Sequence, residues 1–162
     1  MAVRKLEVYL HNQKAGILTD VDGELSFKYD DNGGKALSVR LPVRKEEYGD
    51  KACRPFFENL LPEGNIREAV ARKELVSESN VFSLLDKIGG DCAGAVSLYE
   101  EGPAPKPGGE KDIKEITDEE LYDLINNQAA SPLLTGKNIR LSLAGAQHKF
   151  AIYIKLESTE FL

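Results

Sequence analysis

The stretch Lys5-Leu6-Glu7-Val8-Tyr9-Leu10-His11 decides the fold class, because its apolar and polar residues alternate strictly. Apolar side chains on every second position are typical of a half-buried β-strand. Three further short runs follow it, at residues 15–19, 25–29 and 36–41, and each is preceded by a polar turn. Four runs joined by short turns predict a small antiparallel β meander.

From residue 50 the apolar residues change to the period of a helix. Three helices are predicted, at residues 50–61, 63–73 and 79–88. Asp50 and Ser79 are the expected N-caps of the first and third helices, and Pro62 and Gly89 end them. We interpret the apolar faces of the helices as core packed against the meander, with Cys53 as a small buried hydrophobe. The predicted fold class is therefore α+β.

The composition is that of a globular chain and argues against several classes of site. Of 162 residues, 41% are hydrophobic and 30% charged, and the formal net charge of −6 opposes non-specific binding to nucleic acid or anionic membrane. No apolar run approaches the roughly 20 residues of a membrane helix, and the N-terminus lacks the apolar core of a secretory signal. Two cysteines, Cys53 and Cys92, and two histidines, His11 and His148, predict neither a disulfide framework nor a metal site. We expect a cytoplasmic protein that binds neither membrane nor nucleic acid directly.

Three glycines crowd the stretch Ile88-Gly89-Gly90-Asp91-Cys92-Ala93-Gly94-Ala95-Val96. Such clusters occur where the backbone needs special geometry or approaches another segment closely. We interpret the stretch as a crossing from helix to strand, and we disfavour a nucleophilic Cys92 because no histidine lies near it in sequence. Asp30 and Asp31 also lie beside two glycines, but the alternating oxygen ligands of a calcium loop are missing, which favours a solvated turn.

A Pro/Gly-rich connector divides the chain. Residues 100–110 hold three prolines and three glycines and show no periodic apolar face. Beyond them, Thr117 and Glu120 form a capping box for another helix. The predicted division is a domain of meander and helices at residues 1–100, a connector at 101–116, and a helix with a hairpin at 117–162.

The hairpin surrounds Ser142-Leu143-Ala144-Gly145-Ala146-Gln147-His148-Lys149, which lies between the β-type runs 138–141 and 150–154. Small residues between two strands let backbone N–H groups approach a ligand, and Lys149 adds positive charge, so phosphate is one interpretation. The other is an ordinary hairpin in which Gly145 only permits a positive φ. These residues alone favour the ordinary hairpin, because one glycine falls far short of a fingerprint.

Three segments in order resemble the N-terminal part of the HipA-like serine/threonine kinases, the toxins of bacterial persistence toxin–antitoxin systems. They are Phe56-Phe57-Glu58-Asn59-Leu60-Leu61-Pro62, the glycine-rich stretch 88–96 and the loop 142–149. The resemblance implies that the chain reaches the first strands of a kinase-like nucleotide lobe. It also reverses the interpretation of the loop, which is then expected to cover the phosphates of ATP.

By this resemblance, the complete kinase binds ATP and Mg²⁺, although this chain alone is not expected to bind them tightly. The nucleotide-binding residues implied are Ala144, Gly145, Ala146, Gln147, His148 and Lys149. His148 departs from the acidic or polar residue often seen in the family. Ser142 matches the serine that autophosphorylates there, and the charges of a phosphoserine beside a phosphate-binding loop repel nucleotide and favour another loop position.

The resemblance also implies what the chain lacks. The phosphate-binding lysine, the catalytic Asp and the metal-binding Asp and Asn of the family lie downstream of the hairpin, and Lys155 follows the loop too soon to be that lysine. We therefore expect no catalytic residue here and no kinase activity from this chain alone. Expected partners are a C-terminal kinase domain, in the same or a separate chain, a HipB-like DNA-binding antitoxin, and an aminoacyl-tRNA synthetase as substrate. Two alternatives remain: a separate binding module that restrains a split kinase, and an inactive remnant.

Overall fold

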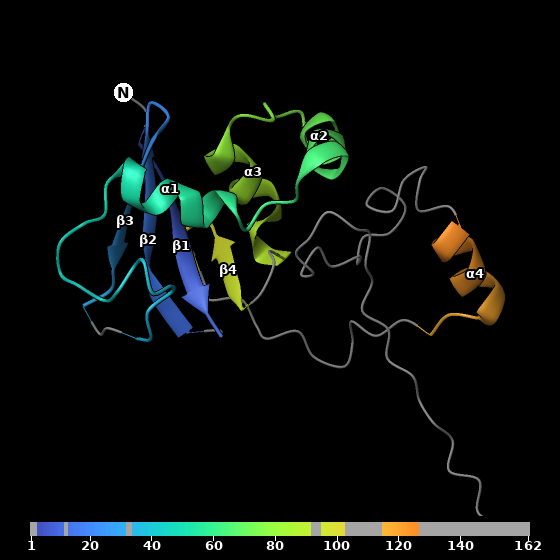
Figure 1. Ribbon diagram of the computed structural model, residues 1–162, viewed down its shortest axis with the longest axis horizontal. Coiled ribbons are helices and arrows are strands. Elements are labelled where there is room, and N and C mark those ends of the chain that lie inside the picture. The colour runs from blue at the N-terminus through green and yellow to red at the C-terminus, as the bar shows by residue number, and fades with distance from the viewer. Residues whose placement is uncertain (1–2, 12, 32–33, 92–94, 103–114, 127–162) are drawn as a thin grey trace, which may run out of the picture.

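The computed structural model describes residues 3–11, 13–31, 34–91, 95–102 and 115–126. It contains a four-stranded antiparallel sheet with the strand order β3-β2-β1-β4, against which helices pack (Figure 1). The strands are β1 (Val3–Leu10), β2 (Gln13–Val21), β3 (Glu24–Tyr29) and β4 (Val96–Tyr99). The helices are α1 (Asp50–Glu58), α2 (Gly64–Lys73), α3 (Val81–Ile88), the short 3₁₀ helix η1 (Gly89–Asp91) and α4 (Asp118–Asn126). The predicted α+β class is confirmed.

Side chains alternate between the two faces of the sheet along β1, β2 and β3, and the apolar ones on one face are buried. Leu6 lies opposite Leu18, which lies opposite Phe27 on the next strand, and each is at most 1% exposed. The turn between β2 and β3 is the predicted Asp22-Gly23, in which both residues have a positive φ, 52° and 92°. This is the geometry of the tight two-residue hairpin. The predicted meander is therefore confirmed for its first three strands.

Helices α1 and α3 supply the other half of the core. Cys53 and Phe57 of α1 and Leu85 of α3 are fully buried, and the Phe57 ring centre lies 5.3 Å from that of Phe27. Figure 1 shows α1 lying across the strands, with α2 and α3 beyond its C-terminal end. Burial of one large apolar side chain stabilises a fold by roughly 1.5–3 kcal/mol. The apolar stripes predicted to be core are confirmed as core.

The strand predicted at residues 36–41 is wrong. Only an isolated bridge occurs there, and the segment forms a loop in which the Tyr29 hydroxyl bonds two backbone groups. Along the outer edge of β3, Phe27 instead exchanges two backbone hydrogen bonds with Tyr48, at 2.8 and 2.9 Å. Tyr48, which follows the apolar run, therefore occupies the position that a fourth meander strand would have taken.

Strand β4 takes the fourth place in the sheet, on the other side of β1 (Figure 1). It follows the glycine-rich stretch, as predicted for a crossing from helix to strand. The backbone of η1 lies so close to β4 that a Cβ at Gly89 would come within 2.8 Å of the Leu98 Cβ. A Cβ at Gly90 would come within 2.9 Å of the Tyr99 ring. Close approach of another segment therefore explains these two glycines.

Two predicted N-caps are each displaced by one residue. Gly49 is the N-cap of α1, whereas Asp50 is the first helical residue and its carboxylate bonds the sheet. Asn80 rather than Ser79 caps α3, and its side chain accepts the N–H of Ser83 at 2.9 Å. In both places two good capping residues stand side by side, so residue type alone does not separate them.

The capping box predicted before the last described helix is confirmed. The Thr117 N–H donates to the Glu120 carboxylate at 3.0 Å, and the Glu120 N–H donates to the Thr117 hydroxyl at 3.2 Å. Helix α4 follows and is described by itself. Both predicted strands of the hairpin and most of the connector lie outside the described residues, so the boundaries at residues 100 and 117 stay predictions.

Candidate functional site

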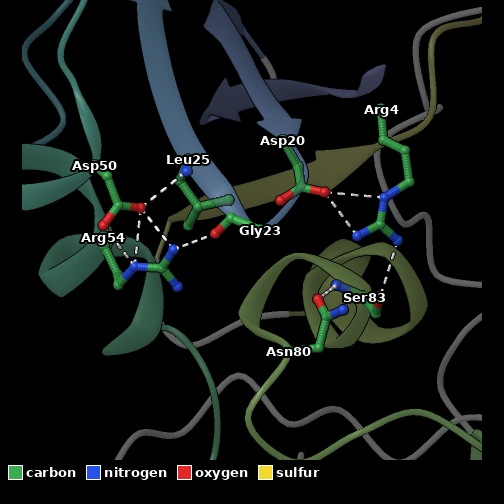
Figure 2. Close-up of polar contacts among 8 residues, drawn as sticks. All are labelled: Arg4, Asp20, Gly23, Leu25, Asp50, Arg54, Asn80 and Ser83. Carbon is green, nitrogen blue, oxygen red and sulfur yellow. Dashed lines mark hydrogen bonds and ion pairs between the residues drawn. The ribbon is translucent and has the colours of Figure 1, made fainter. Parts of the chain in front are cut away.

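Every residue predicted to bind nucleotide, from Ala144 to Lys149, lies outside the described residues, as do Ser142 and Cys92. The structure therefore tests neither the phosphate-covering loop nor the phosphorylation site. It does describe the body that precedes them, from β1 to β4, and the polar groups that hold its helices on the sheet. These groups form two separate networks (Figure 2).

The first network joins the start of α1 to the β2–β3 turn. The Asp50 carboxylate accepts the backbone N–H of Leu25 at 2.8 Å and the Nε–H of Arg54, one helical turn later, at 2.9 Å. Arg54 also donates from Nη2 to the Gly23 carbonyl at 2.5 Å (Figure 2). The hydrogen bond from Arg54 lowers the pKa of Asp50 below its ordinary value of 3.8. The carboxylate is therefore charged at neutral pH and fixes the helix to the turn.

The second network joins β1 and β2 to α3. Arg4 donates from Nε and Nη2 to the Asp20 carboxylate, at 3.1 and 2.8 Å, and from Nη1 to the Ser83 hydroxyl at 2.8 Å (Figure 2). Its guanidinium carbon lies 4.6 Å from the centre of the Phe82 ring, which adds a cation–π contact. The Asp20 side chain is 5% exposed and that of Arg4 41%. The arginine therefore neutralises a buried carboxylate while its own side chain remains partly exposed to water.

Both networks fix helices on the sheet. In each, a carboxylate and a guanidinium bond one another and also a neighbouring backbone or hydroxyl group.

Throughout the part of the chain that the structure describes, no buried side-chain nitrogen or oxygen lacks a hydrogen-bond partner. Among the same residues, no three His, Cys, Asp or Glu side chains are grouped so that they could hold a metal ion. None of the described helices is long and apolar enough to cross a bilayer.

Sequence reasoning missed Asp20 because the predicted second strand ends at residue 19. The observed strand continues to Val21, and Asp20 pairs with Arg4 on one side and Leu25 on the other. Asp20 shares its face with Leu18, two residues earlier, because side chains alternate along a strand. An aspartate on the same face of a strand as buried leucines predicts a buried ion pair.

The face of the sheet opposite the core carries a third polar cluster. The Tyr9 hydroxyl donates to the Glu7 carboxylate at 2.8 Å, and the Lys14 ammonium pairs with the other carboxylate oxygen. The Tyr99 ring meets Tyr9 edge to face at 5.9 Å. The hydrogen bond from Lys14 lowers the pKa of Glu7, and burial raises that of Tyr9. This cluster links β1, β2 and β4 on the second face.

Two of the three segments that carried the family resemblance meet in one core. Phe57 and Leu61 of the first segment and Val96 of the second belong to a single buried cluster, and Ile88 packs against it. Nearby, burial raises the pKa of the Cys53 thiol to about 11, as expected for a small buried hydrophobe and not for a nucleophile. The first two segments therefore build the body, and the third lies outside the described residues.

Comparisons with known proteins relate this body to a family. A family profile described as the HipA N-terminal domain matches residues 6–99. Y4mE of Sinorhizobium fredii, which has "kinase" in its name, is 37% identical over an alignment of 164 positions that covers 95% of this chain and 39% of Y4mE. The serine/threonine-protein kinase toxin HipA of Shewanella oneidensis is 33% identical over 99 positions, 60% of this chain and 22% of the toxin. The chain thus spans two fifths or less of these two relatives.

Two further proteins differ strongly in length. A Haemophilus influenzae protein is 30% identical over 100 positions, which are 61% of this chain but 94% of that protein. In a solved complex of the Shewanella oneidensis toxin–antitoxin system, with HipA, HipB and operator DNA, one chain superposes with a TM-score of 0.64 and 28% identity. That match covers 86% of this chain and 33% of the other. A domain of this size therefore occurs both within long chains and almost alone.

Proposed function

Because the chain belongs to the HipA N-terminal domain family, we propose that it is the N-terminal part of a HipA-like toxin serine/threonine kinase. The observation that carries the proposal is the family match to residues 6–99, which coincides with the body from β1 to β4. Similarity to Y4mE continues past this body, over 95% of the chain. In this proposal the body supports a catalytic region that follows in the same polypeptide or in a separate one.

The proposal extends to the residues beyond the connector. Residues 144–149 form the loop over the ATP phosphates, and Ser142 is the serine that becomes phosphorylated. The support is the order of the three family-like segments in the sequence and the length of the match to Y4mE. Phosphate on Ser142 would place two negative charges beside the loop and favour its displacement.

We propose that residues 1–162 alone do not transfer phosphate, since in the HipA-like kinases that the sequence resembles the catalytic groups lie downstream of the loop that residues 142–149 match. A HipB-type antitoxin is the proposed partner, because the Shewanella HipA of similar fold was solved with HipB and operator DNA. An aminoacyl-tRNA synthetase as protein substrate rests on the family resemblance alone.

A second candidate function is a binding module that acts on a kinase supplied as another chain. The Haemophilus influenzae relative favours it, because 94% of that protein aligns with about 100 residues of this chain. Such a short polypeptide has little room for a catalytic domain. Binding to a separate kinase chain would then replace the intramolecular contact.

The experiment compares the complete kinase polypeptide with residues 1–162, each incubated with ATP and Mg²⁺ and analysed by peptide mass spectrometry. The complete polypeptide should gain phosphate on the peptide that contains Ser142, and residues 1–162 should gain none. Ser142→Ala should abolish the modification, whereas the matched control Ser131→Ala should leave it unchanged.

Phosphate on the isolated chain, free of contaminating kinase, would contradict the proposed dependence on the downstream region. Unchanged phosphorylation of the Ser142→Ala polypeptide would contradict the assignment of the serine. A further sample mixes residues 1–162 with a kinase chain that lacks this region. Inhibition of that kinase would favour the binding module.

A further inference from the structure

Helix α4 has a well-capped start but little to pack against. It has nine residues, and an isolated helix shorter than about 12–15 residues is only marginally stable in water. Among the residues that the structure describes, no other helix or strand packs extensively on α4. Most helices in proteins are stabilised by packing of an apolar face. The helix therefore needs a partner surface.

One side of α4 is apolar. Leu121, Leu124 and Ile125 have the sequence spacing of one helical face. Tyr122, three residues before Ile125, adjoins this face and is 68% exposed. Ile116, just before the helix, is 36% exposed. This side of α4 has the pattern of a buried face, yet its tyrosine lies largely in water.

The charge of the segment limits what can cover it. Residues 115–126 carry five carboxylates and no cation. Residues 110–114 add two carboxylates and two lysines, and residues 127–136 are uncharged, so the neighbouring sequence does not change this balance. Repulsion disfavours nucleic acid, an anionic membrane and the same helix of a second copy. The suitable partner is a protein surface that is apolar and not acidic.

The comparisons indicate which surface this is. The match to Y4mE covers 95% of this chain, so it includes α4, and it leaves most of Y4mE unmatched. The match to the short Haemophilus influenzae protein covers 61% of this chain, which cannot reach from β1 to α4. A counterpart of α4 therefore occurs in the chain that is long enough for a catalytic region, whereas the short match cannot contain both the body and α4.

We infer that α4 is a docking helix whose apolar side packs on the catalytic region of the kinase. The inference rests on the function proposed above, and it names the element that makes the contact. Leu121 and Tyr122 lie in this contact, and the carboxylates on the other side of the helix stay in water. The contact holds the body to the catalytic region, whether the two belong to one polypeptide or to two.

Hydrogen–deuterium exchange measured by mass spectrometry tests the inference on residues 115–126, in the isolated chain 1–162 and in the complete kinase polypeptide. In the isolated chain these amides should exchange rapidly, because the helix is short and unpacked. In the complete polypeptide they should exchange at least tenfold more slowly. Tyr122→Ala should remove about tenfold of this protection, the effect of losing one buried aromatic side chain. Alanine is the best helix former, so the loss would report packing and not helix propensity.

Asp123→Ala is the matched control. Asp123 is exposed and follows Leu121 by two residues, which places it on the opposite side of the helix. Exchange of residues 115–126 in the complete polypeptide should be the same with and without this substitution.

Equal exchange of residues 115–126 in the two samples would overturn the inference, as would unchanged protection in Tyr122→Ala. Slow exchange in the isolated chain would overturn it too, by placing α4 on its own body or, if protection grew with protein concentration, on a second copy. Phosphorylation of Ser142 in the same complete polypeptide tests the proposed function separately. A phosphorylated polypeptide in which residues 115–126 exchange rapidly would overturn the docking and leave the proposed function standing.

Discussion

Replacing Gly89 by alanine tests how closely η1 approaches β4. Gly89 has φ −62° and ψ −23°, which alanine adopts without strain. If its Cβ had room, alanine would stabilise the protein by about 0.4–1 kcal/mol by restricting the unfolded chain. The structure gives it no room, because the Cβ would lie 2.8 Å from the Leu98 Cβ and 3.2 Å from the Leu98 carbonyl oxygen. Gly89→Ala should therefore stabilise the protein if the Cβ has room and destabilise it if η1 lies as close to β4 as in the structure.

The size of the effect follows from the same contacts. Carbon atoms pack at about 3.5–4.0 Å, so η1 or β4 would have to move by roughly 1 Å. Leu98 cannot easily move aside, because it is 2% exposed and its strand is paired with β1 opposite Val8. Such overpacking typically destabilises by about 1–3 kcal/mol, which exceeds the gain from the restricted unfolded chain. We expect Gly89→Ala to lower the free energy of unfolding by a net value of about 1–2 kcal/mol.

Urea unfolding followed by far-UV circular dichroism measures this loss. With an m-value of about 2 kcal/mol/M, the midpoint should fall by roughly 0.5–1 M. Gly90→Ala is the matched control, because the three atoms nearest its Cβ all belong to the outer end of the Tyr99 side chain, the closest at 2.9 Å, and a side chain yields more easily than a strand backbone. We expect that control to change stability by no more than about 0.5 kcal/mol. A midpoint for Gly89→Ala at or above that of the native protein would refute the close approach of η1 to β4.

Two further predictions concern titratable groups in α1. Asp50→Asn should destabilise the protein by about 1–2 kcal/mol at neutral pH, because the bonds from Arg54 and Leu25 then lose a charged acceptor. Since the pKa of Asp50 is lowered in the folded state, its contribution is present above a pH of about 4 and is lost as the pH falls further. Urea midpoints of the native and variant proteins should therefore converge in acid, and a constant gap would contradict the role of the charge. For Cys53, burial and a pKa of about 11 predict that a water-soluble maleimide leaves the native thiol unlabelled at neutral pH and labels it in urea. Peptide mapping checks this, and rapid labelling of the native protein would show that the thiol is accessible.

Local periodicity predicted most of the body because each element has a distinct pattern. The alternation around Val8 and the helical stripe around Phe57 both survive in the structure, since burial of one face dictates them. Residues 36–41 have the same strand-like pattern but become a loop, because Tyr48 bonds the edge of β3 that they would need. No local sequence pattern predicts that Tyr48 rather than residues 36–41 bonds this edge. Strand propensity shows that a segment could lie in a sheet, but it does not predict which strand the segment pairs with.

The polar networks were harder to predict than the core. Arg4 and Ser83 lie 79 positions apart, and Leu25 and Asp50 lie 25 apart, so no motif connects them. Their contacts depend on how the helices settle on the sheet, which follows from packing and not from spacing. The loop at residues 142–149 was singled out by its local composition and by family resemblance, and it stays a prediction because it lies outside the described residues.

The strand order also governs how the nascent chain folds. The unit of β1, β2 and β3 is complete at residue 29, whereas β4, the second neighbour of β1, ends at residue 99, 70 residues later (99 − 29). At synthesis rates of about 5–20 residues per second, this interval lasts roughly 4–14 s. Throughout it, the outer edge of β1 is an open edge strand on which another growing chain can pair. Slower translation between residues 30 and 99 should therefore raise the aggregated fraction of newly made protein.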